Sequence, residues 1–466
     1  MSNNLDVAVL GGGPGGYSAA IRLAQLGAKV VLFEQKYIGG TCLNVGCIPT
    51  KSLLEKAGLI DKIRENKISG LLKDAGLYSW KKIQQEKNNT IKTLVKGVEN
   101  ILQSYDIKVI HEGVKLTADK KMITINSAIE YEAEQVIIAT GSETFIPPIP
   151  GVDGSHVITS TEALSFEKIP KSILIIGGGV IGVEIASIYA SFGTKVTIVE
   201  MLDSILNSED QETVRFMHRK LKNNKIDIFV NTKVINITDK DHLKNIHCEE
   251  ILSHKNLEFK AEYVLVAVGR KANLDLIDVD GLGLNLDNGY IIVDDCLKTD
   301  IEGIYAVGDV TGKFLLAHSA YEQGICAAEN IMGKMKKINI TNMPRCIYTH
   351  PQLAAIGFTE ESLMKSGRQY KKVVFPFAAN GKAIAMKEKG FVKMLVDDTT
   401  DEILGVHMIG NGTTELLSSA LIAMNGGIKA KQLGEMIFPH PTLSEMVKES
   451  ALMVHHEAIH IPKSMK

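Results

Sequence analysis

The sequence predicts an α/β fold built around two copies of one strand, turn, helix and strand unit. The first copy lies at the N-terminus, and the second lies at residues 172–200. A chain of 466 residues also exceeds what one ordinary hydrophobic core supports, so several domains are expected.

The first unit begins with an apolar run from Leu5 to Leu10 and ends with a second apolar strand that closes at Glu34. Between the two strands, a glycine-rich turn leads into a helical pattern, and its motif glycines are Gly11, Gly13 and Gly16. In a G-x-G-x-x-G motif these glycines permit a tight turn, close approach to a pyrophosphate, and close packing of helix on strand. The helix N-terminus then faces the phosphates. The unit predicts a Rossmann-like dinucleotide-binding domain.

The second unit repeats this motif, and its glycines are Gly177, Gly179 and Gly182. The spacing from first glycine to strand-end acid is 23 residues in both units, from Gly11 to Glu34 and from Gly177 to Glu200. At this place a carboxylate can accept hydrogen bonds from the hydroxyls of an adenosine ribose, or it can simply be a solvated strand end. The repeat in register favours binding.

Two dinucleotide-binding units predict two dinucleotides. Glu200 would repel a 2′-phosphate, and residues 201–207 contain no basic side chain, so NAD+ is favoured over NADP+ at the second site. The first site starts with the chain and is followed directly by a cysteine pair, an order that fits tightly bound FAD.

Charge and composition exclude several classes of function. The formal net charge is −2 and no block of like charge occurs, so neither a nucleic-acid partner nor a membrane surface is expected. The N-terminus shows no signal peptide, and no apolar run reaches about 18 residues. Only six cysteines occur, which favours a reducing compartment, and we expect a cytoplasmic protein.

The segment GGTCLNVGCIPTK at residues 39–51 holds Cys42 and Cys47. A metal site would need two further sulfur or nitrogen ligands at suitable spacing, and none accompanies the pair, so no metal is expected. A static bridge is chemically possible, although a reducing compartment opposes it. A redox dithiol beside a flavin dinucleotide fits best.

Further segments complete the pattern: VIIATGS (136–142), GGGVIGVE (177–184), AVGRKAN (267–273), IYAVGDVTG (304–312), IYTHP (347–351) and FPHPTLSE (438–445). With these motifs in this order, the chain resembles the pyridine nucleotide-disulfide oxidoreductases essentially from end to end. Within them it is most similar to the dihydrolipoyl dehydrogenases. That family oxidises protein-bound dihydrolipoyl groups and reduces NAD+ to NADH.

The resemblance implies a glutathione-reductase-type architecture with four regions. These are an FAD-binding domain with the redox disulfide (1–142), an NAD-binding domain (143–268), a central domain that completes the FAD site (269–340) and an α+β dimerisation domain (341–466). It also implies a homodimer. The implied partners are lipoyl domains of a 2-oxo acid dehydrogenase E2 component or the H protein of glycine cleavage.

The resemblance assigns different roles to the two sulfurs. Cys42 is implied to exchange with the dithiol substrate, and Cys47 is implied to lie against the flavin as a charge-transfer thiolate. Exchange needs a thiolate, so an environment that lowers a cysteine pKa is expected, such as a helix N-terminus and a base.

The implied base is His440, with Glu445 holding its imidazole, and in the family this histidine reaches the cysteines of the opposite subunit. Thr442 to Glu445 also reads as a capping box, which would give Glu445 a purely helical role. Phe438 departs from the family, because many members carry a further histidine there.

The remaining cofactor contacts are carried over from the family motifs. Lys51 is implied to lie near the flavin, paired with Glu184, and the alternative is an exposed helix lysine. Asp309 is implied to contact the ribityl chain, although it could cap the next turn. The other implied positions are Thr41, Gly113, Thr140, Gly141, Val234, Gly269, Ala317 and His318.

Two alternatives stay open. A glutathione-type disulfide reductase shares the cysteine and histidine motifs, but it would be expected to use NADPH, which Glu200 disfavours. A nucleotide-binding subunit without turnover is the alternative from another class. The intact cysteines, His440 and Glu445 argue against it.

Overall fold

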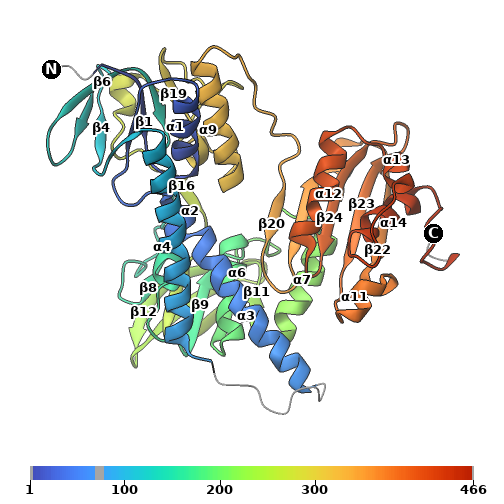
Figure 1. Cartoon of the computed structure of the whole chain (residues 1–466). Coiled ribbons are helices and arrows are strands. Elements are labelled where there is room, and N and C mark those ends of the chain that lie inside the picture. Colours follow the sequence, from blue (N-terminus) through green and yellow to red (C-terminus); the bar gives the residue numbers. More distant parts are fainter. Residues whose placement is uncertain (1–3, 69–77, 464–466) are drawn as a thin grey trace.

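Three larger sheets of seven, five and five strands organise the residues that the computed structural model describes, 4–68 and 78–463 (Figure 1). The first two are built around parallel strands, and the third is antiparallel. This confirms the predicted α/β class with two Rossmann-like domains and an α+β C-terminal domain.

The first sheet has the strand order β3-β2-β1-β6-β5-β4, with β19 also paired to β6. Its strands are β1 (Asn4–Leu10), β2 (Val30–Phe33), β3 (Lys108–Ile110), β4 (Val114–Leu116), β5 (Met122–Thr124), β6 (Glu130–Ile138) and β19 (Ile304–Ala306). Its helices are α1 (Pro14–Gln25) and α9 (Ala317–Ile331), which lie side by side (Figure 1). Every residue of β2 is buried, as in a parallel sheet covered on both faces.

The second sheet has the order β11-β10-β9-β15-β8. Its strands are β8 (Val157–Ile158), β9 (Ser172–Ile176), β10 (Lys195–Val199), β11 (Ile226–Phe229) and β15 (Tyr263–Val266). An antiparallel layer adds β12 (Thr232–Lys240), β13 (Leu243–Glu250) and β14 (Asn256–Ala261). The helices here are α5 (Ser160–Ala163), α6 (Val180–Ser191) and α7 (Gln211–Asn223).

The C-terminal sheet has the order β20-β21-β24-β23-β22. Its strands are β20 (Arg345–Ile347), β21 (Leu353–Gly357), β22 (Tyr370–Pro376), β23 (Phe391–Asp397) and β24 (Ile403–Ile409). Its helical elements are α10 (Glu360–Ser366), η2 (Phe377–Ala379), α11 (Gly381–Ala385), α12 (Thr413–Asn425), α13 (Ala430–Glu435) and α14 (Glu445–Val454).

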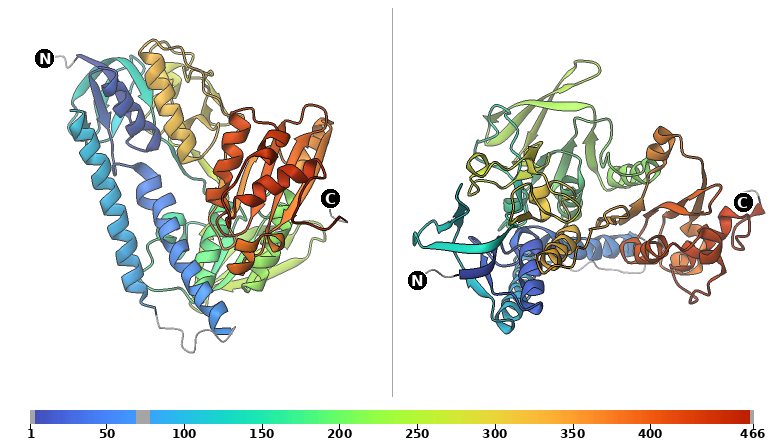
Figure 2. Two further views of the ribbon diagram at one scale, coloured as in Figure 1. Left: turned by 45° about the vertical axis from the view of Figure 1, so that its right-hand side comes forward. Right: turned by 90° about the horizontal axis from the view of Figure 1, so that it is seen from above.

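Two long helices connect the first sheet with the second. After the short helix α2 (Gly40–Val45), α3 (Cys47–Ile68) and α4 (Trp80–Ser104) lie beside each other, and α3 packs on α6 (Figure 2). The other elements are β7 (Ser142–Thr144), β16 (Arg270–Ala272), α8 (Val279–Leu282), β17 (Leu286–Asp287), β18 (Tyr290–Ile291) and η1 (Gly308–Thr311). Strands β7 and β16 pair with each other. The division into four domains at residues 142, 268 and 340 stays a prediction.

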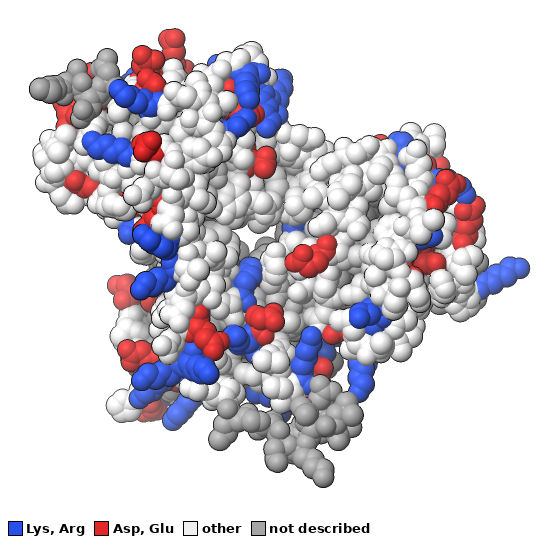
Figure 3. Space-filling view, viewed as in Figure 1, with Lys and Arg blue, Asp and Glu red and all other residues white. Residues whose placement is uncertain are grey.

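The described surface shows no dominant charge. On the face in Figure 3, Lys and Arg side chains lie among Asp and Glu side chains rather than in a patch of one sign. Among the described residues, no helix combines the length and apolar character that crossing a bilayer requires.

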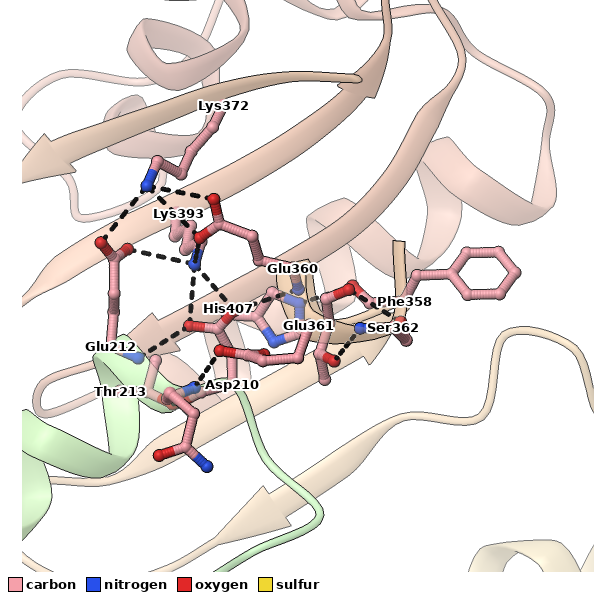
Figure 4. Close-up of polar contacts among 12 residues, drawn as sticks. Asp210, Glu212, Thr213, Phe358, Glu360, Glu361, Ser362, Lys372, Lys393 and His407 are labelled. Atoms are coloured by element: carbon pink, nitrogen blue, oxygen red, sulfur yellow. Dashed lines mark hydrogen bonds and ion pairs between the residues drawn. The ribbon is translucent and has the colours of Figure 1, made fainter. Parts of the chain in front are cut away.

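A buried lysine joins the C-terminal domain to the region of the second sheet (Figure 4). Lys393 on β23 has no exposed surface. Its ammonium lies 2.8 Å from Asp210 Oδ2 and 3.1 Å from Glu212 Oε2, both at the start of α7, and 2.6 Å from Glu360 Oε2 at the start of α10. Burial raises the pKa of Asp210, but the ammonium of Lys393 and the backbone N–H of Glu360 hold that pKa below its ordinary value. The charges therefore stabilise one another across the domain contact.

Lys393→Met removes the ammonium and leaves Asp210 as a buried carboxylate without its cation. We expect the free energy of unfolding, measured by urea denaturation at neutral pH, to fall by about 3–5 kcal/mol. Lys371→Met on the exposed side of β22 is the matched control, and it should change stability by less than about 0.5 kcal/mol. Equal stability of the two variants would contradict the role of the network.

His407 on β24 lies beside this network and is fully buried. Its Nε2–H donates to the Phe358 carbonyl at 2.8 Å, whereas Nδ1 has no hydrogen-bond partner among the described residues. Burial lowers the pKa of His407 to about 4. The imidazole is therefore neutral in the folded protein at neutral pH.

This burial predicts acid destabilisation in a defined window. An unfolded histidine has a pKa of about 6.5, so between about pH 6.5 and about pH 4 the unfolded chain binds a proton that folded His407 does not. The melting temperature should fall as the pH is lowered through this window. His407→Gln should flatten this pH dependence, whereas His254→Gln at an exposed site should retain it. A His407→Gln protein that keeps the full dependence would refute the assignment.

Candidate active site

The first glycine turn has the geometry that close backbone approach requires. Gly11 has a φ of +111°, and a Cβ on Gly16 would lie 1.8 Å from the Gly11 carbonyl oxygen. Helix α1 follows with Gly13 as its N-cap, without a side-chain cap and without an acidic residue in its first turn. Its N–H groups are therefore left for an anionic ligand, as a pyrophosphate requires.

The second turn repeats this geometry at the start of α6. Gly177 has a φ of +109°, and a Cβ on Gly182 would lie 2.1 Å from the Gly177 carbonyl oxygen. Gly179 is the N-cap of α6, again without a side-chain cap or an acid in the first turn. The two turns are thus equivalent in backbone conformation as well as in sequence.

Both strand-end acids brace their own glycine turn, a role that sequence reasoning missed. Glu34 Oε2 accepts the Gly12 N–H at 2.7 Å, and Glu200 Oε2 accepts the Gly178 N–H at 2.6 Å. A carboxylate accepts about four hydrogen bonds, so each acid retains capacity for ribose hydroxyls. Contact of Glu34 and Glu200 with ribose stays a prediction.

Residues after β6 provide a polar atom that fits a ligand at the first turn. A Cβ on Gly11 would lie 2.3 Å from the Ala139 carbonyl oxygen, which places residues 139–141 against the turn. Thr140 Oγ1 is buried and has no hydrogen-bond partner within the described ranges. Gly141, with a φ of +72°, follows it. An unpaired hydroxyl beside a dinucleotide turn is consistent with a bound FAD.

Asp309 belongs to a cluster of three side chains. It accepts a hydrogen bond from the Ser142 hydroxyl, and the Arg270 Nε–H donates to the same hydroxyl at 2.7 Å. Burial raises the pKa of Asp309. Sequence reasoning did not single out Ser142 or Arg270, although both stand inside motifs that it used.

The other predicted cofactor residues lie near the same elements. Helix α9 begins at Ala317 without a side-chain cap, and His318 Nε2 pairs with the Pro344 carbonyl at 3.0 Å, so its side chain is engaged elsewhere. Val234 lies on β12, which begins where the Thr232 N–H donates to the Glu200 carbonyl at 2.9 Å. Gly113 precedes β4, Gly269 precedes β16, and Thr41 lies in α2. Their contacts with cofactor stay predictions.

The cysteine segment is attached to the first glycine turn. The Gly39 N–H donates to the Gly12 carbonyl at 2.8 Å, and a Cβ on Gly40 would lie 2.7 Å from Gly13 Cα. Cys42 follows in α2, and Cys47 begins α3. The two thiols therefore lie next to the turn that would hold the pyrophosphate of FAD.

The two sulfurs differ in acidity. A hydrogen bond from the Cys42 thiol and the nearby Lys51 ammonium lower the pKa of Cys47 to about 7, against the effect of burial. The negative charge on Cys47 in turn raises the pKa of Cys42. Cys47 is therefore the thiolate of the pair when both are reduced, in line with the different roles that the family resemblance implies.

An ion pair fixes Lys51 across two domains. Its ammonium lies 3.0 Å from Glu184 Oε2 on α6 and 4.6 Å from the ring centre of Tyr348. Glu184 is almost fully buried and also accepts the Tyr348 N–H at 2.9 Å. The expected pairing of Lys51 with Glu184 is present, and its place near a flavin stays a prediction.

The predicted base has its expected partner. His440 Nδ1 lies 2.9 Å from Glu445 Oε1, and Glu445 Oε2 accepts the Thr442 N–H at 2.9 Å. Glu445 thus orients the imidazole and also accepts the Thr442 N–H. It does not complete a capping box, because α14 begins at Glu445 itself with Ser444 as its N-cap. Burial raises the pKa of Glu445, but these two hydrogen bonds bring it below its ordinary value.

His440 and the cysteines lie apart within one chain. The His440 side chain is 76% exposed, and no hydrogen bond or ion pair in the described ranges joins it to Cys42 or Cys47. Figure 1 shows α14 and α2 in separate parts of the molecule. If His440 serves as the base for these cysteines, it must do so across a subunit contact.

Residues 5–324 match the model of the pyridine nucleotide-disulphide oxidoreductase family, and residues 343–451 match the dimerisation domain of that family, which supports a homodimer.

The dihydrolipoyl dehydrogenase of Bacillus subtilis is 38% identical over 463 residues, covering 98% of this chain and 100% of that protein. The dihydrolipoyl dehydrogenase of Zymomonas mobilis is 39% identical, covering 99% and 100%. The Cu(II) complex of the HOCl-induced flavoprotein disulfide reductase RclA from Escherichia coli has a TM-score of 0.88 at 28% identity, covering 97% and 100%. The chain therefore belongs to the pyridine nucleotide-disulphide oxidoreductase family.

Proposed function

We propose that this chain is a dihydrolipoyl dehydrogenase, which oxidises protein-bound dihydrolipoyl groups and reduces NAD+ to NADH with FAD as its bound cofactor. The observation that carries this proposal is the cysteine pair attached to the first glycine turn, with Cys47 acidified by Cys42 and Lys51. Full-length relatives named for this activity support it.

The first unit would hold FAD. The turn at Gly11–Gly16 would receive its pyrophosphate, Glu34 its ribose, and Asp309 its ribityl chain. FAD held there would supply the chemistry for two-electron transfer between the dithiol and NAD+. The second unit, with Glu200, would hold NAD+.

The protein's own residues carry out the thiol exchange. A substrate thiolate attacks Cys42 Sγ, a substrate–Cys42 disulfide forms, and Cys47 leaves as a thiolate. The second substrate thiolate then attacks the substrate sulfur of that disulfide and releases Cys42. His440 of the partner subunit takes the proton of the first substrate thiol, and the proton of the second passes to Cys42 as that sulfur is released.

The proposed partners are a second copy of this chain and lipoyl domains of a 2-oxo acid dehydrogenase E2 component or the glycine cleavage H protein. The proposed location is the cytoplasm. The sparse cysteines support a reducing compartment, in which a half-buried redox dithiol can cycle.

Steady-state kinetics with dihydrolipoamide test the proposal. The FAD-loaded protein should reduce NAD+ with a kcat/KM at least about tenfold higher than with NADP+, because Glu200 repels a 2′-phosphate. Glu200→Gln should lower the ratio of kcat/KM for NAD+ to kcat/KM for NADP+. Glu250→Gln at the end of β13 should leave this ratio unchanged. Oxidation of NADPH by a disulfide such as glutathione disulfide, without turnover of dihydrolipoamide, would instead identify a glutathione-type reductase.

The pKa of Cys47 should depend on a hydrogen-bond donor at position 42. In Cys42→Ala the donor is lost, so the pKa of Cys47 should rise from about 7, whereas Cys42→Ser keeps a hydroxyl donor and should stay closer to the wild type. The measurement is the thiolate absorbance of the reduced protein against pH. Identical titration of the two variants would show that Cys42 does not acidify Cys47.

A further inference from the structure

Two tyrosines that the proposed mechanism does not use meet beside Cys42. Tyr17 on α1 donates its hydroxyl hydrogen to Tyr321 Oη on α9 at 2.9 Å, with the rings edge to face at 5.8 Å between centres. Within the described ranges, the hydroxyl hydrogen of Tyr321 has no acceptor. The pair therefore offers one free donor.

Close backbone contacts fix the position of this pair. A Cβ on Gly324 would lie 2.2 Å from the Gly15 carbonyl oxygen, so α1 and α9 touch one turn from the two tyrosines. Gly40, two residues before Cys42, touches Gly13 in the same way. Glycine contacts thus hold three elements, α1, α9 and α2, together around the hydroxyl pair and the Cys42 sulfur.

The ionisation of both phenols is sensitive to charge on the cysteines. Burial raises the pKa of Tyr17 and of Tyr321, the hydrogen bond to Tyr321 raises the pKa of Tyr17 further, and a negative charge at Cys42 would raise both. Both residues therefore stay protonated donors over the working pH range. The described contacts include no hydrogen bond from either phenol to Cys42, so that sulfur does not engage the Tyr321 donor.

We propose that Tyr17 and Tyr321 position the dithiol substrate, with Tyr321 donating a hydrogen bond to the substrate sulfur that attacks Cys42. Tyr17 is a positioning residue, because its hydroxyl hydrogen holds Tyr321 Oη in place. This inference rests on the proposed function. It adds a donor from the subunit that carries the cysteines, separate from the imidazole of the other subunit.

The chemical consequence concerns the first exchange step. A hydrogen bond to the substrate thiolate stabilises the anion before it forms the bond to Cys42 Sγ and breaks the Cys42–Cys47 bond, releasing Cys47 as a thiolate. The substrate proton still goes to the base. The donor therefore increases the fraction of bound substrate that is ionised at a given pH.

The test compares Tyr321→Phe with Tyr105→Phe in the FAD-loaded protein. Tyr105 is a matched control. Among the contacts described, its hydroxyl accepts one hydrogen bond, from the Gln25 side chain at the C-terminal end of α1. The reaction is reduction of the disulfide form by dihydrolipoamide without oxygen, followed in a stopped-flow instrument by absorbance. Tyr321→Phe should slow it about tenfold or more and move its pH profile to higher pH.

Two further readouts separate positioning from a structural effect. NADH-dependent reduction of ferricyanide does not need the dithiol, so Tyr321→Phe should leave it unchanged. Tyr17→Phe keeps the Tyr321 hydroxyl and should lose less rate than Tyr321→Phe. Rates for Tyr321→Phe equal to those for Tyr105→Phe, or equal losses in both activities, would overturn the proposal.

Dithiothreitol separates this inference from the proposed function. A wild-type protein that is reduced by dithiothreitol but not by dihydrolipoamide would contradict the proposed substrate. The rates at which dithiothreitol reduces Tyr321→Phe and Tyr105→Phe would then still decide whether the tyrosine pair acts on an incoming thiolate. A tenfold lower rate in Tyr321→Phe alone supports this role, and equal rates in the two variants refute it.

Discussion

The chemistry of the site depends on the closeness of Cys42 to Cys47. It makes the two sulfurs chemically different, because the charge settles on Cys47 at the start of α3. Lys51 supports that charge and is itself held by Glu184 on α6, the helix of the second glycine unit. The redox pair is thus fixed to both dinucleotide-binding units, to the first by backbone contacts at Gly40 and to the second by an ion pair.

In the proposed reaction, His440 of the C-terminal domain acts as the base for the cysteines of a second subunit. His440 presents its free nitrogen to the exterior while Glu445 fixes the other one. Such a base needs a well-defined position relative to its own subunit before it can serve another. The buried Lys393 ion pairs attach the antiparallel sheet to α7, and neutral His407 donates to the Phe358 carbonyl within the C-terminal domain.

Patterns local in sequence made most of the fold predictable. The two glycine units share one spacing from first glycine to strand-end acid. Their turns need glycine because a side chain there would clash with nearby backbone. Contacts between distant segments were not predictable. Lys393 lies in an apolar strand, and no neighbouring residue in the sequence indicates that it pairs with Asp210. Ser142 contacts Arg270 only because β7 pairs with β16. The role of Glu445 also required coordinates, because the sequence presents capping and imidazole support as alternatives, and α14 begins only at Glu445.

The central claim is that the cysteine pair exchanges electrons with a flavin held by the first glycine turn. Anaerobic titration of the FAD-loaded protein with dihydrolipoamide tests it most directly. The account predicts a long-wavelength absorbance, typical of a thiolate beside an oxidised flavin, that develops with one equivalent per subunit and is absent in Cys47→Ser. Bleaching of the flavin without that absorbance, or its persistence in Cys47→Ser, would contradict the account.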